Sequence, residues 1–372
     1  MIYKCCHLTS VHSRFDIRIY QKECRSLTQK YDVFLIVADG LGDEIKDGVS
    51  IIDVGKFKGR KNRMLNAPKA LFKKAIELDA DLYHLHDPEL LPIALKLRRV
   101  GKVVVFDAHE DFPKQVLSKH YLNTHVAKLI SISIKYYENY VCSKLDAVVT
   151  ATPSIRDKFA KHTKKVVDIN NYPLLGELQS INKDWANIVE EIAYVGGISK
   201  IRGIQEAVEA LSLTKTKTKL NLVGRFSDQQ TYSLAQASSG WQYVDELGQL
   251  DREQVKRILE RSIAGLVTFL PVPNHIDAQP NKMFEYMSAG IPVIGSNYPL
   301  WVNIIEGNDC GICVDPENPT AIAQAIDKLV SNKDLAEAMG KNGIKAVNEK
   351  YNWAIEEKKL FKLYDELLGT KL

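Results

Sequence analysis

The chain contains 372 residues, of which 45% are hydrophobic and 26% are charged. This length suits two domains of ordinary size, and the composition excludes a disordered chain or a coiled coil. Residues 1–175 hold 29 Lys and Arg against 20 Asp and Glu, whereas the rest of the chain holds 21 against 26. A basic first half and an acidic second half predict two domains with different partners, unless the difference is drift in surface composition.

Three features of the sequence indicate the cellular compartment: the start of the chain, the length of the apolar runs and the pattern of cysteines. No basic start followed by a long apolar core is visible after Met1, so no secretory signal is expected. No apolar run approaches the ~18 residues that cross a bilayer. The six cysteines are scattered and predict no disulfide framework, as is typical of a reducing cytoplasm. We therefore expect a cytoplasmic protein.

In the first half of the chain, short apolar segments alternate with longer amphipathic ones. Strands are predicted at Ile2–Leu8, Val33–Ala38, Ser50–Val54, Leu82–Leu85, Val103–Phe106, Ala147–Thr150 and Val166–Ile169. Helices are predicted at Asp16–Lys30, Arg63–Leu78, Glu89–Val100, Asn123–Cys142 and Ser154–Lys161. In the helix Asn123–Cys142, apolar residues at helical spacing mark one face: Val126, Leu129, Ile130, Ile134, Tyr137 and Val141. This alternation indicates a parallel sheet covered by helices on both faces.

A polar, irregular stretch from Asn170 to about Val189 breaks the alternation, which then restarts. Strands are predicted at Ile192–Val195, Leu220–Val223, Gln242–Val244, Ala264–Phe269, Pro292–Ile294 and Ile312–Val314. Helices are predicted at Gly203–Leu213, Arg252–Ser262, Asn281–Ala289, Ala321–Leu329 and Trp353–Leu368. The predicted fold class is α/β, with two doubly wound, Rossmann-like domains at residues 1–172 and 187–351, joined by a linker at 173–186. Ligands of such sheets bind beyond the carboxyl ends of the strands, so a shared ligand is expected in a cleft between the domains.

Polar residues follow the first predicted strand, in the segment 9–16. Ser10 and Asp16 lie in this short segment, which leads into a helix whose N-terminus can receive an anion or a sugar hydroxyl. Asp16 is also a good helix N-cap, and the two interpretations are compatible.

Histidines and carboxylates gather after two further strands. His84 and His86 are two residues apart, so they share one face of a strand. With Asp87, Asp107 and His109 close by, a metal cluster is conceivable. The two clusters predict a site, but they do not identify its chemistry.

In the second half, a strand is followed by Gly197, Lys200 and Arg202, and then by a helix start. Small residues let a phosphate approach the backbone, and the helix N-terminus and the cations attract it. Arg225 completes a second strand–glycine–cation sequence. No Walker A loop is present and no G-x-G-x-x-G follows a predicted strand, which argues against an ordinary NAD enzyme or P-loop NTPase.

The most specific segment is residues 277–294. Asn281 and Lys282 open a helix, and Glu285 lies about one turn into it. Helix N-terminal N–H groups suit a diphosphate, and a carboxylate one turn in can accept two hydrogen bonds from a ribose diol. An ordinary amphipathic helix would explain the apolar residues here but not the polar cluster at its start.

With these motifs the sequence resembles the retaining, nucleotide-sugar-dependent glycosyltransferases of the GT-B fold, in the large bacterial group called family 4. The resemblance covers essentially the whole chain and is strongest at Pro280–Ile294, which is similar to the family's E-x7-E donor segment. Supporting motifs lie at 86–88, 107–110, 195–197 with 202–203, and 223–225. The resemblance implies an acceptor-binding first domain, a second domain that holds most of the nucleotide sugar, and a terminal helix (352–372) that crosses back to the first.

The resemblance also implies roles for single residues. Glu285 matches the second glutamate of the motif, which binds the donor ribose, and the first falls on Asp277, a shorter side chain. Either Asp277 still reaches the donor sugar, or Asn281 and Lys282 have taken over its role.

Two further departures concern the diphosphate. Arg202 stands where the family has a lysine, and Gly197 stands where it usually has an arginine. Lys200, Lys282 or Arg225 can compensate. His109 matches the histidine near the hydroxymethyl group and reacting carbon of the donor sugar.

The predicted catalytic residues are His109, Arg202 and Lys282. The predicted substrate-binding and donor-binding residues are Glu285, Asp277, Asn281, Gly197, Lys200, Arg225, Ser10, Asp16 and His86. The implied reaction moves a glycosyl group from a nucleotide-diphosphate sugar to a hydroxyl of a glycan or lipid-linked glycan with retention of configuration, in O-antigen, capsule or exopolysaccharide biosynthesis. UDP-sugars are expected before GDP-sugars as donors. No metal or other cofactor and no nucleic acid are expected.

The basic excess of the first half concentrates in residues 56–74, and no acid lies between Asp53 and Glu77. This segment is either a solvated loop and helix face or a surface for an anionic partner. The resemblance favours an undecaprenyl-diphosphate-linked acceptor and the inner face of the cytoplasmic membrane, to which we expect peripheral association.

Two alternatives remain open from the sequence. One is a metal-dependent hydrolase built on His84, His86 and His109. The other is a non-catalytic, two-lobed sugar-binding protein, although such proteins are usually exported.

Overall fold

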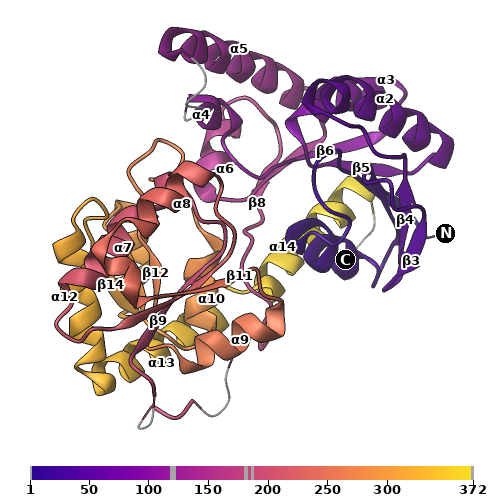
Figure 1. The fold of residues 1–372 in the computed structure, drawn as a ribbon. Coiled ribbons are helices and arrows are strands. Elements are labelled where there is room, and N and C mark those ends of the chain that lie inside the picture. Colours follow the sequence, from indigo (N-terminus) through magenta and orange to yellow (C-terminus); the bar gives the residue numbers. More distant parts are fainter. Residues whose placement is uncertain (1, 118–122, 180–182, 186–187, 370–372) are drawn as a thin grey trace. The chain divides into compact units, whose positions relative to one another are not determined.

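The computed structural model describes residues 2–117, 123–179, 183–185 and 188–369 (Figure 1). Contacts divide the chain into two compact domains. The first extends to Asn171 and includes the segment that begins at Trp353, and the second extends from Tyr172 to Asn352. Parts of the predicted segmentation lie outside the described residues: residues 180–182 and 186 of the linker, residue 187 at the predicted start of the second domain, residues 1 and 118–122 of the first domain, and residues 370–372 of the terminal helix.

The first domain is built on one sheet with the strand order β3-β4-β2-β1-β5-β6-β7-β8. Its strands are β1 (Lys4–Leu8), β2 (Asp32–Val37), β3 (Glu44–Lys46), β4 (Val49–Asp53), β5 (Leu82–Leu85), β6 (Val103–Ala108), β7 (Ala147–Thr150) and β8 (Val166–Asp168). The described strands pair in parallel, except that the edge strand β3 is antiparallel to β4. The central strands β1, β5 and β6 are neighbours, so the polar loops that follow them come together at one edge of the sheet.

The helices of this domain follow the predicted alternation. They are η1 (Ile17–Cys24), α1 (Arg25–Leu27), α2 (Arg60–Leu78), η2 (Pro88–Leu90), α3 (Leu91–Arg99), α4 (Phe112–Leu117), α5 (Thr124–Cys142), α6 (Pro153–Phe159) and α14 (Trp353–Leu368). The terminal helix α14 packs on the first domain, where Trp353 donates from Nε1 to Ser26 Oγ (2.9 Å) and Asp365 accepts from Tyr31 Oη (2.6 Å).

Helix α5 differs from the interpretation of its apolar face. Of the six residues predicted to mark that face, only Val141 is buried, and Ile134 is half-buried. Val126, Leu129, Ile130 and Tyr137 are exposed. The helix instead turns Ala127, Glu138, Val141 and Cys142 inward. Ala127 is small, and the carboxylate of Glu138 pairs with Lys158 Nζ. Because these two residues face the domain, the larger apolar side chains of α5 face outward.

The second domain has a parallel sheet with the strand order β11-β10-β9-β12-β13-β14. Its strands are β9 (Glu191–Val195), β10 (Lys219–Val223), β11 (Val244–Gly248), β12 (Ala264–Val267), β13 (Val293–Ser296) and β14 (Gly311–Val314). Its helices are η3 (Lys200–Arg202), α7 (Ile204–Leu213), α8 (Gln229–Gln236), η4 (Ser239–Tyr243), α9 (Arg252–Arg261), α10 (Asn281–Ser288), α11 (Pro299–Ile305), α12 (Pro319–Val330) and α13 (Lys333–Glu349).

The second domain departs from the sequence prediction at one strand and at three helices. The strand predicted at Gln242–Val244 is wrong, because a 3-10 turn covers Ser239–Tyr243 and β11 begins only at Val244. Helices α8, α11 and α13 are not predicted. In α13, Gly340 and Gly343 weaken the helical pattern. Gly340 has a packing reason: a Cβ there would lie 2.2 Å from the carbonyl oxygen of Gly290.

No helix in the described part of the chain is long and apolar enough to cross a membrane. All six cysteines are free, as the scattered pattern predicts.

Candidate functional site

The π-helix η1 places two ionisable side chains, Arg18 and Glu23, inside the first domain. Residues five apart lie nearly above one another in such a helix, and Arg18 Nε lies 3.2 Å from Glu23 Oε1. Arg18 also donates from Nε and from its second terminal nitrogen to the two carboxylate oxygens of Asp107, both at 2.8 Å. Burial and the charge of Asp107 raise the pKa of Glu23. Burial also raises the pKa of Asp107, but Arg18 together with His109 and His86 outweighs burial and holds that pKa well below its usual range. Asp107 is therefore the ionised partner of Arg18.

Asp107 ends a chain of buried imidazoles. His86 Nδ1 and His109 Nε2 lie 3.3 and 3.1 Å from Asp107 Oδ2. His7 Nδ1 lies 2.8 Å from His86 Nε2, and Tyr364 Oη of α14 lies 3.1 Å from His7 Nε2. With Asp107 ionised, His86 and His109 each donate a hydrogen to it. His86 Nε2 then accepts from His7, and His7 accepts from Tyr364.

This chain of hydrogen bonds leaves one nitrogen for a ligand. Burial lowers the pKa of His7, and it lowers the pKa of His86 to about 4, so both are neutral at physiological pH. The side chain of His109 is 18% exposed, and its Nδ1 has no hydrogen-bond partner within the described residues. His109 Nδ1 is thus the accessible end of the chain.

A metal ion fits this cluster poorly. Two sets of side chains have metal-ligand spacing: His7, Glu23, His84 and His86, and also His86, Asp107 and His109. However, His7 and His86 already share a hydrogen bond, and the guanidinium of Arg18 contacts both carboxylates at 2.8–3.2 Å. A divalent cation at either place would face that fixed positive charge at short range. The hydrogen-bond network explains these residues better than the metal cluster that their sequence pattern makes conceivable.

The loop after β1 contributes a second histidine. Ser10 donates from its backbone N and its Oγ to Asp87 Oδ2 (2.6 and 3.2 Å), and Asp16 caps η1 by accepting from the N–H groups of Arg18 and Ile19. His12 lies between the two carboxylates, with Nδ1 3.5 Å from Asp16 Oδ2 and Nε2 3.4 Å from Asp87 Oδ1.

His12 therefore favours its charged form. Burial lowers its pKa, but the hydrogen bond to Asp16 and the charges of Asp87, Asp16 and Asp107 together outweigh burial, so the pKa of His12 is raised. Its ring centre lies 4.9 Å from that of His109. His12 is not among the predicted site residues, although it lies in the predicted segment 9–16. Ser10, Asp16, His86 and His109 are brought to this one edge of the sheet.

In the second domain, the central feature is a buried lysine. Lys282, the second residue of α10, is 7% exposed, and its Nζ has no hydrogen-bond partner in the described structure. The Nζ lies 3.7 Å from the ring centre of Tyr194 and 5.3 Å from that of Phe269. Burial and the nearby charge of Arg202 lower the pKa of Lys282 well below its usual value. A buried amine with no acceptor is unfavourable, and an anion at this place would satisfy it.

Arg202 is held beside Lys282 by glycine geometry. Its guanidinium donates to the carbonyl oxygen of Gly197 (2.9 Å), and a Cβ at Gly197 would lie 2.4 Å from the donating nitrogen. The next residue, Gly203, has φ +71°, and a Cβ there would lie 1.8 Å from the carbonyl oxygen of Thr268. Gly203 is therefore required for this turn, whereas a side chain at Gly197 would only displace the guanidinium of Arg202.

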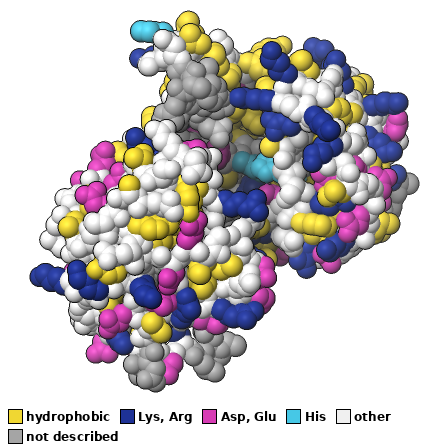
Figure 2. All heavy atoms as spheres, in the orientation of Figure 1, with side chains coloured by type: hydrophobic (Ala, Val, Ile, Leu, Met, Phe, Trp, Pro, Cys, Tyr) yellow, Lys and Arg dark blue, Asp and Glu magenta, His cyan; other side chains and the backbone are white. Residues whose placement is uncertain are grey.

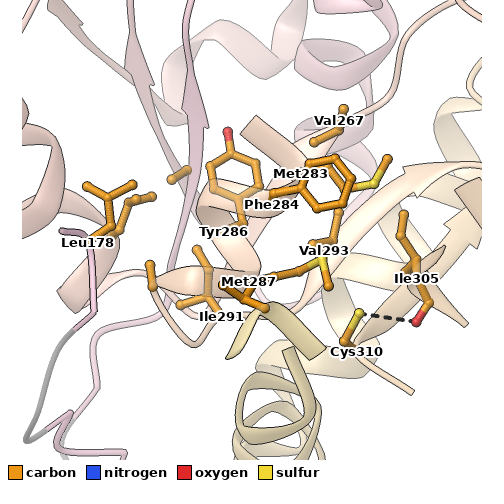
Figure 3. Close-up of a cluster of buried hydrophobic side chains, with 14 of the residues drawn as sticks. Leu178, Val267, Met283, Phe284, Tyr286, Met287, Ile291, Val293, Ile305 and Cys310 are labelled. Carbon is orange, nitrogen blue, oxygen red and sulfur yellow. Dashed lines mark hydrogen bonds between the residues drawn. The ribbon is translucent and has the colours of Figure 1, made fainter. Parts of the chain in front are cut away.

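Glu285 is fixed by an arginine that the sequence did not single out. Arg252 donates to Glu285 Oε1 (2.8 Å) and makes two hydrogen bonds to Glu177, both at 2.8 Å. No hydrogen bond within the described residues reaches the other oxygen, Glu285 Oε2, which is available to a ligand. On the side of α10 away from Lys282 and Glu285, Met283, Phe284 and Met287 pack into the core (Figure 3). That core fixes the direction in which Lys282 and Glu285 point.

The remaining predicted donor residues are less constrained. Asn281 and Asp277 are exposed, at the first position of α10 and in the segment before it. Lys200 and Arg225 are also exposed, and no hydrogen bond or ion pair in the described structure joins them to Arg202 or Lys282. The structure therefore groups Gly197, Arg202, Lys282 and Glu285, and leaves the other four at the surface.

Comparisons with known proteins match both halves of the chain. The family model "Glycosyltransferase Family 4" matches residues 18–171, and "Glycosyl transferases group 1" matches residues 182–346. The capsular polysaccharide biosynthesis glycosyltransferase CapM of Staphylococcus aureus is 25% identical over 187 residues, which are 48% of this chain and 46% of CapM. An uncharacterised glycosyltransferase of Methanocaldococcus jannaschii is 28% identical over 185 residues, 48% of this chain and 46% of that protein. The chain thus spans about half the length of the curated relatives it matches.

Solved structures resemble the chain along its whole length. Sucrose-phosphate synthase of Thermosynechococcus elongatus has a TM-score of 0.80 at 17% identity, over 99% of this chain and 100% of that one. HepE of Anabaena in complex with UDP-glucose has a TM-score of 0.76 at 12% identity, over 98% and 100%. These likenesses and the two parallel sheets confirm the predicted α/β architecture of two Rossmann-like domains.

Proposed function

Because the chain belongs to the family 4 glycosyltransferases of the GT-B fold, we propose that it transfers a glycosyl group from a nucleotide-diphosphate sugar to a hydroxyl of a glycan or lipid-linked glycan acceptor, with retention of configuration. The observation that carries this proposal is Lys282, a buried amine without an acceptor at the start of a helix. HepE binds UDP-glucose, which supports a UDP-sugar donor, with GDP-sugars next. The name of CapM supports a role in bacterial surface polysaccharide, such as capsule, exopolysaccharide or O-antigen.

The second domain would hold the donor through four groups. Lys282, Arg202 and the first N–H groups of α10 bind the diphosphate, and the uncommitted Oε2 of Glu285 accepts from the ribose diol. Arg252 positions Glu285 for this contact. The diphosphate gains negative charge as it leaves, and donors already directed at that place stabilise it more than they stabilise the bound substrate. Gly197 leaves the space that the guanidinium of Arg202 occupies.

The first domain would supply sugar and acceptor contacts. His109 Nδ1 accepts a hydrogen bond from a hydroxyl of the donor sugar, because Asp107 holds the hydrogen on Nε2. Ser10, Asp16 and His86 shape the same region, the last by fixing the ring of His109 through Asp107. In the transfer step the bond from the anomeric carbon to the phosphate oxygen breaks. The bond to the acceptor oxygen forms on the same face, and the acceptor proton passes to the leaving phosphate.

The acceptor is proposed to be an undecaprenyl-diphosphate-linked glycan at the inner face of the cytoplasmic membrane. In residues 56–74, Lys56, Lys58, Lys61 and Lys69 are exposed, as an electrostatic contact with anionic headgroups requires. Arg63 also forms an ion pair within the protein, since one of its terminal nitrogens lies 3.7 Å from Glu89 Oε1.

The experiment is release of nucleoside diphosphate from a panel of UDP- and GDP-sugars, with product anomers identified by NMR. We expect Glu285→Ala to lose nearly all turnover and Arg252→Leu to raise KM for the donor more than it lowers kcat, because Arg252 only positions the carboxylate. Intact turnover in Glu285→Ala would refute the donor site. Stoichiometric bound zinc with chelator-sensitive hydrolysis would support the hydrolase, and binding without turnover would support a sugar-binding protein.

A further inference from the structure

Helix α5 carries an apolar face that the protein itself does not cover. Leu129, Ile132, Tyr136 and Tyr140 are 67%, 52%, 71% and 57% exposed, and at helical spacing they form one stripe. The buried residues of α5 lie on the opposite side. Figure 2 shows hydrophobic side chains at the surface over α5. An exposed apolar stripe of this size marks an interaction surface.

The same face of the first domain is strongly basic. Helix α3 contacts both α2 and α5, and α5 extends away from the other two helices (Figure 1). Together they hold eleven Lys and Arg and two Glu. Glu138 is buried against Lys158 and adds no charge to the surface. Glu77 is exposed and offsets part of the charge of Lys73 and Lys74, so the surface of the three helices keeps a large excess of positive charge.

We propose that α5 inserts its apolar stripe into an anionic lipid surface while the cations of α2, α3 and α5 contact the headgroups. This proposal rests on the proposed function, since a lipid-linked acceptor would be met at such a surface. It adds an inserting element to the electrostatic contact expected of residues 56–74. Lys128 and Lys135 are exposed on α5 and can reach headgroups when the stripe is buried. Tyrosine suits the level of the headgroups, and leucine and isoleucine suit the start of the acyl chains.

The positive charge around the stripe favours an anionic lipid surface over a second copy of the chain as its partner. A symmetric dimer through α5 would place two basic faces against each other. An anionic bilayer instead matches both the charge and the apolar stripe. The α5 helix lies in the surface rather than crossing it, because its inward side is committed to the domain through Val141 and Cys142.

The experiment is flotation of the full chain with vesicles of phosphatidylglycerol and phosphatidylcholine, against vesicles of phosphatidylcholine alone. We expect salt-sensitive binding to the anionic vesicles and at least about a tenfold weaker partition for Leu129→Glu/Ile132→Glu. Leu234→Glu, at a residue of α8 that is also exposed, is the matched control and should bind like the parent. Tyr136→Trp should gain fluorescence quenching by brominated lipid, which reports insertion rather than adsorption.

Two results would overturn the proposal. One is unchanged vesicle binding by Leu129→Glu/Ile132→Glu, provided that thermal unfolding shows the variant to be folded. The other is a parent dimer that this variant dissociates, which would assign the stripe to a second copy. Vesicle binding needs no turnover, and donor turnover with a soluble acceptor needs no vesicle. Loss of the first with the second intact would therefore remove this inference and leave the proposed function standing.

Discussion

Replacing Lys282 by methionine separates a binding role from a structural one. Methionine has nearly the length of lysine and can keep the contacts with Tyr194 and Phe269. The amine has no hydrogen-bond partner to lose within the described residues, and its pKa is lowered by burial. We therefore expect the free energy of unfolding of Lys282→Met to lie within about 1 kcal/mol of the parent value, or above it.

Diphosphate binding should change far more. A hydrogen bond from a charged donor contributes about 1.5–3 kcal/mol, so the affinity for UDP should fall about 10- to 150-fold. Urea unfolding gives the first quantity and calorimetric titration of UDP gives the second. Lys328→Met, at an exposed position of α12, is the control and should change neither. A large loss of stability with unchanged UDP affinity would refute the reasoning and make Lys282 a structural residue.

Three further predictions follow from protonation and backbone geometry. UDP binding should take up protons in the pH range that lies between the lowered pKa of Lys282 in the free protein and its higher pKa beside a diphosphate. Binding heats measured across pH in two buffers of different ionisation enthalpy show the uptake, and Lys282→Met should abolish it. Because the pKa of His12 is higher in the folded state than the value of about 6.5 in the unfolded state, protonated His12 stabilises the fold fully at pH values below 6.5. This stabilisation is lost as the pH rises through the folded-state pKa. His12→Gln should therefore lower the free energy of unfolding more at about pH 5.5 than at about pH 9. Gly203→Ala should lower the free energy of unfolding by about 3 kcal/mol or more, because its Cβ would overlap the carbonyl oxygen of Thr268, whereas Gly42→Ala, with a similar φ and open space, should cost only about 1–2 kcal/mol.

The sequence carries enough information for most of the sheet, because buried parallel strands are runs of β-branched residues between turn residues. It does not show the side on which a helix packs. In α5 the largest apolar side chains point outward, and Ala127 and Glu138 point inward, a choice made by the fit to neighbouring elements and by the ion pair with Lys158. Binary pattern alone predicts the opposite.

The candidate site likewise contains some residues that the sequence predicts and others that it does not. Residues in one motif, such as Lys282 and Glu285, are predicted together because helical spacing places them on one helix end. Partners far apart in the chain are not predicted. Arg252 meets Glu285 only through the packing of α9 and α10, and Arg18 reaches Asp107 from the π-helix η1, which has no clear sequence signature. The burial of Lys282, which leaves its amine without a hydrogen-bond partner and favours binding of an anion, is likewise a property of the folded domain.

Thermal unfolding with nucleotides tests the central claim most directly. At about 100 times the dissociation constant, a nucleoside diphosphate that binds the native protein should add ~2.7 kcal/mol to its stability. We predict that UDP raises the melting temperature most, followed by GDP and then ADP. The monophosphate CMP should have little effect, because Lys282 and Arg202 are proposed to bind the second phosphate, which CMP lacks. If none of these diphosphates raises the melting temperature, or if CMP raises it as much as UDP, the proposed donor site is contradicted.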